Sequence, residues 1–336
     1  MFLRWLWYFT GARLIDALVV LVAICILPYF ILFKRGKWGA KKPAVKNIDL
    51  NDLIGRGPKD PERDGIYSDS TDNHNLMTHI GHGFFHPGQT ELMINGATSL
   101  KGELFRKVPG KYGLDPSNDI LAAWCYFYVV CNLKCSYLVK DVADKWWRSC
   151  LNLLNKDGKQ SDRCANAGVI WGCPNSWMGL SKPTIGSSYL SGAALLALAA
   201  RELGGKWKFR YYMFKLLSFG WFWERFPWMP TAKHPFGYVG HVCQMCLYVI
   251  HKCGHNMEPG LRWIAVDNAP RQGIQPFIGG MAAECGVLTA KEKANALEWL
   301  LAQATEWPQH FHISKKKDFK LWSMMAHAAV QLTGRD

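Results

Sequence analysis

The longest apolar run in the chain covers residues 14–33 and contains one charged residue, Asp16. Twenty helical residues rise about 30 Å, which matches the hydrocarbon core of a bilayer. A secretory signal peptide has a shorter apolar run that ends at a small-residue cleavage site, whereas this run ends in Pro28-Tyr29-Phe30-Ile31-Leu32-Phe33. Aromatic residues cluster in the preceding segment, 2–9, as they do at the headgroup level of membranes. The pattern therefore predicts a single membrane-spanning helix and a lipid bilayer as partner.

The charges on either side of this run are unequal. Arg4 and Arg13 precede it, and six basic residues with no acidic residue follow it, at Lys34, Arg35, Lys37, Lys41, Lys42 and Lys46. Basic residues concentrate on the cytoplasmic side of membrane helices. The charge bias predicts a single-pass protein whose C-terminal body is cytoplasmic.

The hydrophobic pattern divides the remaining chain into two parts. Residues 47–115 are polar and rich in Gly, Pro and Asp, so we expect a loop-rich arm, with Asn95-Gly96 as a possible turn between two short strands. From about residue 116 apolar residues recur at helical spacing. We expect an all-α fold, with residues 1–46 as anchor and basic flank, 47–115 as the arm and 116–336 as a helical domain.

The helical domain contains six clear helical segments. We expect helices over residues 117–133, 139–154, 184–203, 238–252, 290–305 and 317–332. Gly204-Gly205 should end the third of these. Thr289 with Glu292 has the spacing of a capping box at the start of the fifth. Residues 238–252 are apolar nearly all round, so this helix should be buried.

Composition narrows the possible chemistry. Half of the net charge of +14 lies in residues 1–46, which hold eight basic residues and one acidic residue, and no nucleic-acid motif accompanies the rest. We therefore expect no nucleic-acid partner. The eleven cysteines show no regular spacing, which is typical of reduced, buried thiols. Cys243 and Cys246 lie near histidines and allow a zinc interpretation, but buried core cysteines fit a continuous helix better.

A cluster of histidines and carboxylates lies in the arm. Four histidines, including His74 and His79, fall within thirteen residues and follow Asp69 and Asp72. Such side chains supply general acids and bases near neutral pH, or bind a metal, although the spacing is not that of a zinc helix. The alternative is a hydrogen-bonded polar loop. We assign Asp69, Asp72, His74 and His79 as candidate catalytic residues, and we expect no metal and no cofactor.

Eleven of the twenty-two residues from Trp207 to Trp228 are aromatic, and Lys208, Arg210, Lys215 and Arg225 are interleaved with them. Three interpretations remain open for this segment: core packing, a helix on the membrane surface, and a wall of stacking faces for sugar rings. Loop residues beside helix ends add candidate substrate contacts. The candidate substrate-binding set is Trp171, Asn175, Trp177, Trp223, His234 and Arg271.

Long Gly-, Pro- and aromatic-rich loops joining paired helices resemble the α/α-toroid enzymes of glycan metabolism. The resemblance rests on residues 183–189 opening an Ala-rich helix and on residues 275–280 preceding the next. It implies a helical-barrel hydrolase or lyase acting on a carbohydrate. Our leading hypothesis is therefore a membrane-anchored helical enzyme acting on a glycan or glycan-lipid by acid–base chemistry. The alternative is a non-enzymatic membrane-bound scaffold or assembly protein with a second aromatic-basic membrane contact.

Overall fold

The computed structural model describes fifteen stretches of the chain. They are residues 49–56, 84–85, 88, 90–98, 100, 102, 104–107, 111–114, 118–151, 185–218, 220–225, 227, 237–268, 278–310 and 318–334. The predicted anchor, residues 14–33, lies outside them. None of the helices within the described stretches combines the length and apolar character needed to cross a bilayer.

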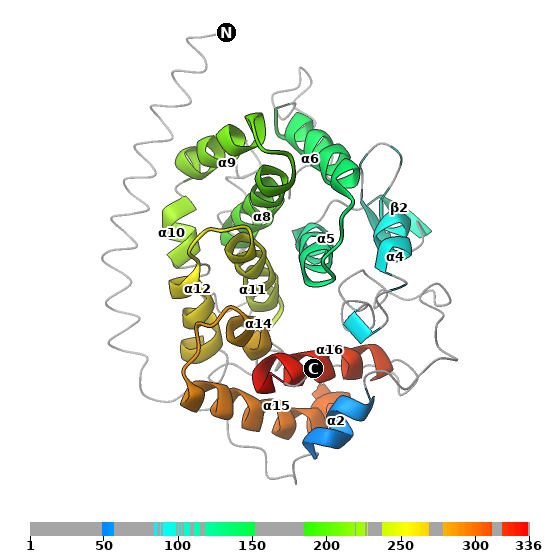
Figure 1. The fold of residues 1–336 in the computed structure, drawn as a ribbon, viewed down its shortest axis with the longest axis vertical. Helices are drawn as coiled ribbons and strands as arrows, with labels where there is room; N and C mark the ends of the chain where they lie inside the picture. The colour runs from blue at the N-terminus through cyan, green and yellow to red at the C-terminus, as the bar shows by residue number, and fades with distance from the viewer. Residues whose placement is uncertain are drawn as a thin grey trace.

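The described residues are mainly helical, so the predicted all-α character is confirmed (Figure 1). The helices are α2 (Leu50–Arg56), α4 (Thr90–Gly96), α5 (Asn118–Val130), α6 (Ser136–Leu151), α8 (Ile185–Leu203), α9 (Lys206–Leu217), α10 (Gly220–Arg225), α11 (Gly237–Lys252), α12 (Glu258–Arg262), the π-helical turn η4 (Trp263–Asn268), α14 (Ile278–Glu284), α15 (Ala290–His310) and α16 (Asp318–Thr333). One antiparallel pair of short strands, β1 (Phe105–Lys107) and β2 (Lys111–Leu114), lies among them.

Helices α5, α8 and α11 form the centre of the hydrophobic core. Residues 189–200 of α8 and residues 242–250 of α11 are all buried, and both helices pack against α5. The many alanines of α8 keep its sides thin, so neighbouring helices approach it from several directions. The prediction that residues 238–252 form a buried helix is confirmed.

Two predicted helix boundaries are confirmed in detail. Helix α8 ends at Leu203, and Gly204 and Gly205 both take positive φ angles, which L-residues with a side chain rarely adopt. At the start of α15, the Glu292 amide donates to Thr289 Oγ1 (3.3 Å) and the Thr289 amide donates to Glu292 Oε2 (2.9 Å). This reciprocal pair is the capping box that the sequence indicated.

The predicted turn at Asn95-Gly96 was wrong. These residues end helix α4, and Ile94 of that helix is fully buried in the core. Thr98 Oγ1 donates to the Ile94 carbonyl (2.7 Å) and accepts from Trp124 Nε1 (3.0 Å), which fixes the end of α4 against α5. Asn and Gly also favour the conformations that end helices, and tertiary packing selected this role over a hairpin.

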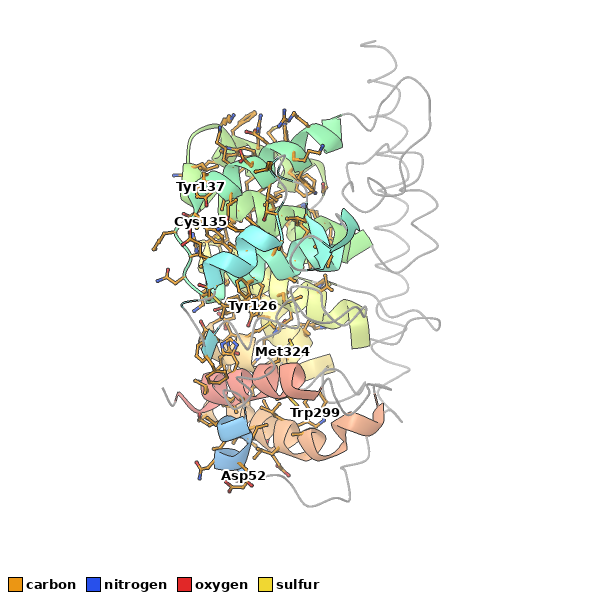
Figure 2. The ribbon with its side chains drawn as sticks, turned by 90° about the vertical axis from the view of Figure 1, so that its right-hand side faces the viewer. Asp52, Tyr126, Cys135, Tyr137, Trp299 and Met324 are labelled. Atoms are coloured by element: carbon orange, nitrogen blue, oxygen red, sulfur yellow. The ribbon has the colours of Figure 1, made fainter. Side chains whose placement is uncertain are left out.

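The C-terminal helices form one end of the body. Helix α16 packs on α14, α15 and α2, and Leu53 of α2 is fully buried there. In Figure 2, Asp52 on α2 lies at this end, and Tyr137 on α6 lies towards the other. Helices α9 and α10 lie along one edge of the body, on the side opposite α4 and β2 (Figure 1).

Candidate functional site

Most of the sequence-predicted site residues lie outside the described residues. These are the candidate catalytic Asp69, Asp72, His74 and His79 and the candidate substrate contacts Trp171, Asn175, Trp177, His234 and Arg271. Their assignment therefore stays a prediction. The described residues contain no group of three or more His, Cys, Asp or Glu side chains placed to hold a metal ion.

Trp223 is the one predicted substrate contact within the described residues. It lies on α10, half-buried against the hydrophobic core, with its ring at right angles to that of Phe222 (centroids 5.0 Å apart). Its indole N–H is buried and has no hydrogen-bond partner among the described residues. The side chain contributes to packing beneath α10.

Exposed large hydrophobic side chains concentrate on α9 and α10. Among the described residues six such side chains are exposed, and four of them are Phe209 (67%), Tyr212 (58%), Leu216 (69%) and Trp221 (56%). Phe209, Tyr212 and Leu216 follow the three- and four-residue spacing of one helix face, and Trp221 is the second residue of the next helix, α10. We call these four residues the α9–α10 ridge. Single exposed apolar residues are common, whereas exposed apolar side chains that gather in one region are more frequent at interaction surfaces.

The opposite side of α9 is also aromatic, but it is buried. Trp207, Tyr211 and Phe214 point into the core, where Phe214 stacks on Tyr189 of α8 (centroids 5.4 Å apart). The contacts of the inner face therefore hold α9 against the body, and the side chains of the outer face are not needed for this packing. The ridge does not contribute to the described core, so its apolar character needs another explanation.

A buried carboxylate joins α10 to α8 and α9. Glu224 accepts hydrogen bonds from Tyr189 Oη (3.0 Å) and Tyr211 Oη (3.5 Å), and Lys215 Nζ lies 2.5 Å from Glu224 Oε2. Burial, reinforced by the charge of Glu224, raises the pKa of both tyrosine hydroxyls, so they remain protonated donors. This network fixes α10, the helix that carries Trp221, against α8 and α9.

A second cluster fixes the N-terminal half of α9. The guanidinium group of Arg210 lies over the rings of Trp207 (4.4 Å) and Trp147 (5.0 Å), and Nη1 donates to Asp144 Oδ1 of α6 (3.4 Å). Cation–π contacts of this kind favour a planar guanidinium group. Arg210 is therefore held within the protein, although it lies on a surface helix.

Other cations around the ridge form no short ion pair with the described residues. Lys208 and Arg225 are exposed and form no ion pair with any of the described residues. Lys206 is also exposed, and its ammonium group is 3.9 Å from Asp144, at the limit of an ion pair. Helical spacing places Lys208 on one side of the Phe209–Leu216 line and Lys206 on the other. The outer face thus combines apolar side chains with free positive charges.

Another polar cluster joins α11, α14 and α16. The Glu284 carboxylate accepts from Tyr248 Oη (2.5 Å) and Gln331 Nε2 (2.5 Å), and Lys252 Nζ is 2.9 Å away. Burial alone would raise the pKa of Glu284, but these hydrogen bonds and the Lys252 charge hold it below its usual value. The carboxylate is ionised and its contacts are satisfied, which is typical of a structural link between helices.

The cysteines of α11 are core residues. Cys243 and Cys246 are fully buried, and burial raises the pKa of both thiols well above the usual value. Thiolate is the form that binds metals and attacks electrophiles, so these groups are inert in the folded protein. The prediction of buried core thiols at Cys243 and Cys246 is confirmed.

The sequence indicated the aromatic-basic segment but not which of its residues face outward. Core packing describes the buried inner face of α9, and the membrane-surface and sugar-stacking interpretations both stay predictions for its exposed outer face. Sequence reasoning missed Leu216 and Glu224. Glu224 has a signal that could have been read, because it is the only acidic residue between Glu202 and Glu258. A lone acid in an aromatic and basic stretch indicates an internal ion pair.

The comparisons with known proteins give no relative. No family model, curated protein or solved structure matches this chain.

Proposed function

We propose that this protein is a membrane-tethered assembly or scaffold protein whose helical body lies on the bilayer surface through the α9–α10 ridge. The observation that carries the proposal is the exposure of four large apolar side chains on two consecutive helices, three of them on one face of α9, with basic residues beside them. Aromatic and aliphatic groups enter the headgroup region of a bilayer, and flanking Lys and Arg remain at its surface.

The physical gain from such a contact is modest for each residue. Transfer of a large apolar side chain from water contributes about 1.5–3 kcal/mol when burial is complete. The ridge residues are already partly covered, so each would contribute about 1–2 kcal/mol. Four such residues provide a weak, reversible contact if the body acts alone.

The N-terminal segment strengthens this contact in the proposal. Residues 14–33 would hold the chain in the bilayer, and sixteen residues separate Phe33 from Leu50 at the start of α2. A chain of that length spans at most about 60 Å. The ridge therefore meets the same bilayer at a high effective concentration, so a weak contact is sufficient.

Site-specific crosslinking tests the contact. Phe209 is replaced by the photoreactive p-benzoylphenylalanine in the full chain, and the chain is reconstituted with lipid vesicles. Irradiation should attach lipid to the chain, which mass spectrometry detects as added mass. The matched control carries the same group at Tyr137 of α6, which is also an exposed aromatic residue (56%).

Lipid attachment at position 209 but not at position 137 supports the proposal. Equal attachment at both positions, or none at 209, contradicts it. Attachment of a second protein chain at 209 would show instead that the ridge is an interface between copies. A second experiment places the photoreactive residue at position 212. Replacing Phe209 and Leu216 together by Ser should then reduce lipid attachment at that position.

The glycan-enzyme hypothesis stays a prediction, as does its α/α-toroid architecture. Its acid–base residues lie outside the described residues, and Trp223 is half-buried beneath α10. Alanine substitution of Asp69, Asp72, His74 and His79 in turn tests it directly.

A further inference from the structure

We propose that the α9–α10 ridge recognises acidic lipid headgroups, and that Lys206, Lys208 and Arg225 make this recognition. The inference rests on the proposed bilayer contact and names the lipid class that it takes. Some cations around the ridge are held by contacts within the protein, whereas others form no short ion pair with the described residues and can bind a phosphate group.

Two of the basic residues are held by internal contacts. Lys215 forms its ion pair with the buried Glu224, and Arg210 is enclosed by Trp147, Trp207 and Asp144. Removal of either contact would leave a partly buried charge without its partner, which is unfavourable. These two cations position the helices and are not available to lipid.

Three basic residues remain available. Lys208 and Arg225 have no ion-pair partner among the described residues. Lys206 is exposed and has two long contacts, 3.9 Å to Asp144 and 5.4 Å to the centre of the Trp207 ring, both longer than those of Arg210. Arg225 lies one helical turn after Trp221 on α10, so both occupy the same face. Lys206 and Lys208 flank Phe209 on α9. Each free cation thus lies beside an apolar group that would enter the bilayer.

The surrounding sequence also favours an acidic surface. Between Glu202 and Glu258 the chain has seven Lys and Arg residues and one acidic residue, and that residue is the buried Glu224. Few exposed carboxylates are therefore present there to repel phosphate groups. Acidic lipids are enriched in the cytoplasmic leaflet, which is the side that the charge bias around residues 14–33 predicts for the body.

The experiment uses the full chain with the crosslinker at position 209, in phosphatidylcholine vesicles with and without phosphatidylglycerol. The charge variant carries Lys208→Gln and Arg225→Gln. The control variant carries Lys134→Gln and Lys140→Gln, two exposed lysines around the start of α6. The readout is the ratio of lipid-linked to unlinked chain, at low and at high salt.

The inference predicts a high ratio only with phosphatidylglycerol, and a lower ratio at high salt because salt screens the attraction. Loss of Lys208 and Arg225 should lower the ratio roughly 30-fold, at about 1 kcal/mol for each charge near an acidic surface. The control variant should keep the original ratio.

The possible failures are distinguishable. Equal lipid attachment with and without phosphatidylglycerol overturns the headgroup inference and leaves the bilayer contact in place. An unchanged ratio in the Lys208 and Arg225 variant overturns the assignment of those residues. Absence of lipid attachment in both vesicle types overturns the proposed function itself.

Discussion

At the scale of single residues, the main unusual feature is a buried histidine. His327 of α16 is 3% exposed and stacks on Phe84 (centroids 4.0 Å apart), and its Nε2 has no hydrogen-bond partner within the described part of the chain. Burial lowers its pKa to about 4, although the nearby charge of Glu284 acts in the opposite direction. The imidazole is therefore neutral in the folded protein at physiological pH.

This histidine predicts a pH dependence of stability. The unfolded chain binds a proton at His327 below about pH 6.5, whereas the folded chain does not until about pH 4, so acid favours unfolding between these values. From pH 7 to pH 5 the free energy of unfolding should fall by about 2 kcal/mol through this residue. Urea denaturation of the wild-type chain and of His327→Leu at both pH values measures the difference.

The leucine variant should lose most of this dependence and keep its stability at pH 7 within about 1 kcal/mol, because an unpartnered polar atom is removed. His251 and His255, whose pKa values are also lowered by burial, would still contribute. The same pH response in both chains would contradict the assignment.

At the scale of elements, a close approach determines the position of α10. Gly220 at the start of α10 lies against Tyr189 of α8, and an added Cβ atom would be 1.9 Å from the tyrosine Oη. The absence of a side chain allows Tyr189 to reach Glu224 from beneath. One glycine therefore allows both the packing of α10 and the hydrogen bond that holds it.

Gly220→Ala should destabilise the protein by about 2–3 kcal/mol, since the helix must move and the Tyr189–Glu224 bond weakens. The matched control is Gly55→Ala in α2, where an added Cβ atom meets nothing within 4 Å. That change should be neutral or stabilising by up to about 1 kcal/mol. Thermal or urea unfolding of the two variants gives the comparison, and equal effects would refute the packing argument.

At the scale of the whole molecule, the helices form a continuous core from α5 to α16. Cys125, Cys243 and Cys246 lie at its centre, each fully buried, and burial raises the pKa of each thiol. A reagent can reach these thiols only when the helices around them separate. Their reactivity therefore reports opening of the core.

These three thiols should stay unmodified by iodoacetamide in the native protein at pH 8, and should react fully in denaturant. Peptide mass spectrometry measures modification at each cysteine. In low denaturant, the rates at which iodoacetamide modifies the three thiols should be equal, because one cooperative opening of the core exposes all three. Rapid native modification of Cys243 alone would show that α11 opens independently.

The sequence by itself determined features that depend on neighbours along the chain. Helical periodicity predicted α5, α6, α8, α11, α15 and α16, because one face of each must be apolar. Local hydrogen-bonding and backbone preferences likewise predicted the stop at Gly204 and the capping box at Thr289. The short helix α4 was missed, because its seven residues cover less than two full turns and Asn-Gly is also common in hairpin turns.

Only the tertiary structure decided which aromatic residues face outward. Trp207 and Phe209 belong to the same aromatic-basic segment, yet one is buried and the other is exposed, because α6 and α8 cover a single side of α9. Tertiary packing also pairs Lys215 with Glu224, whereas Lys208 forms no ion pair with the described residues. These differences arise from contacts between segments that are distant in the sequence. The order of residues along one helix does not reveal such contacts.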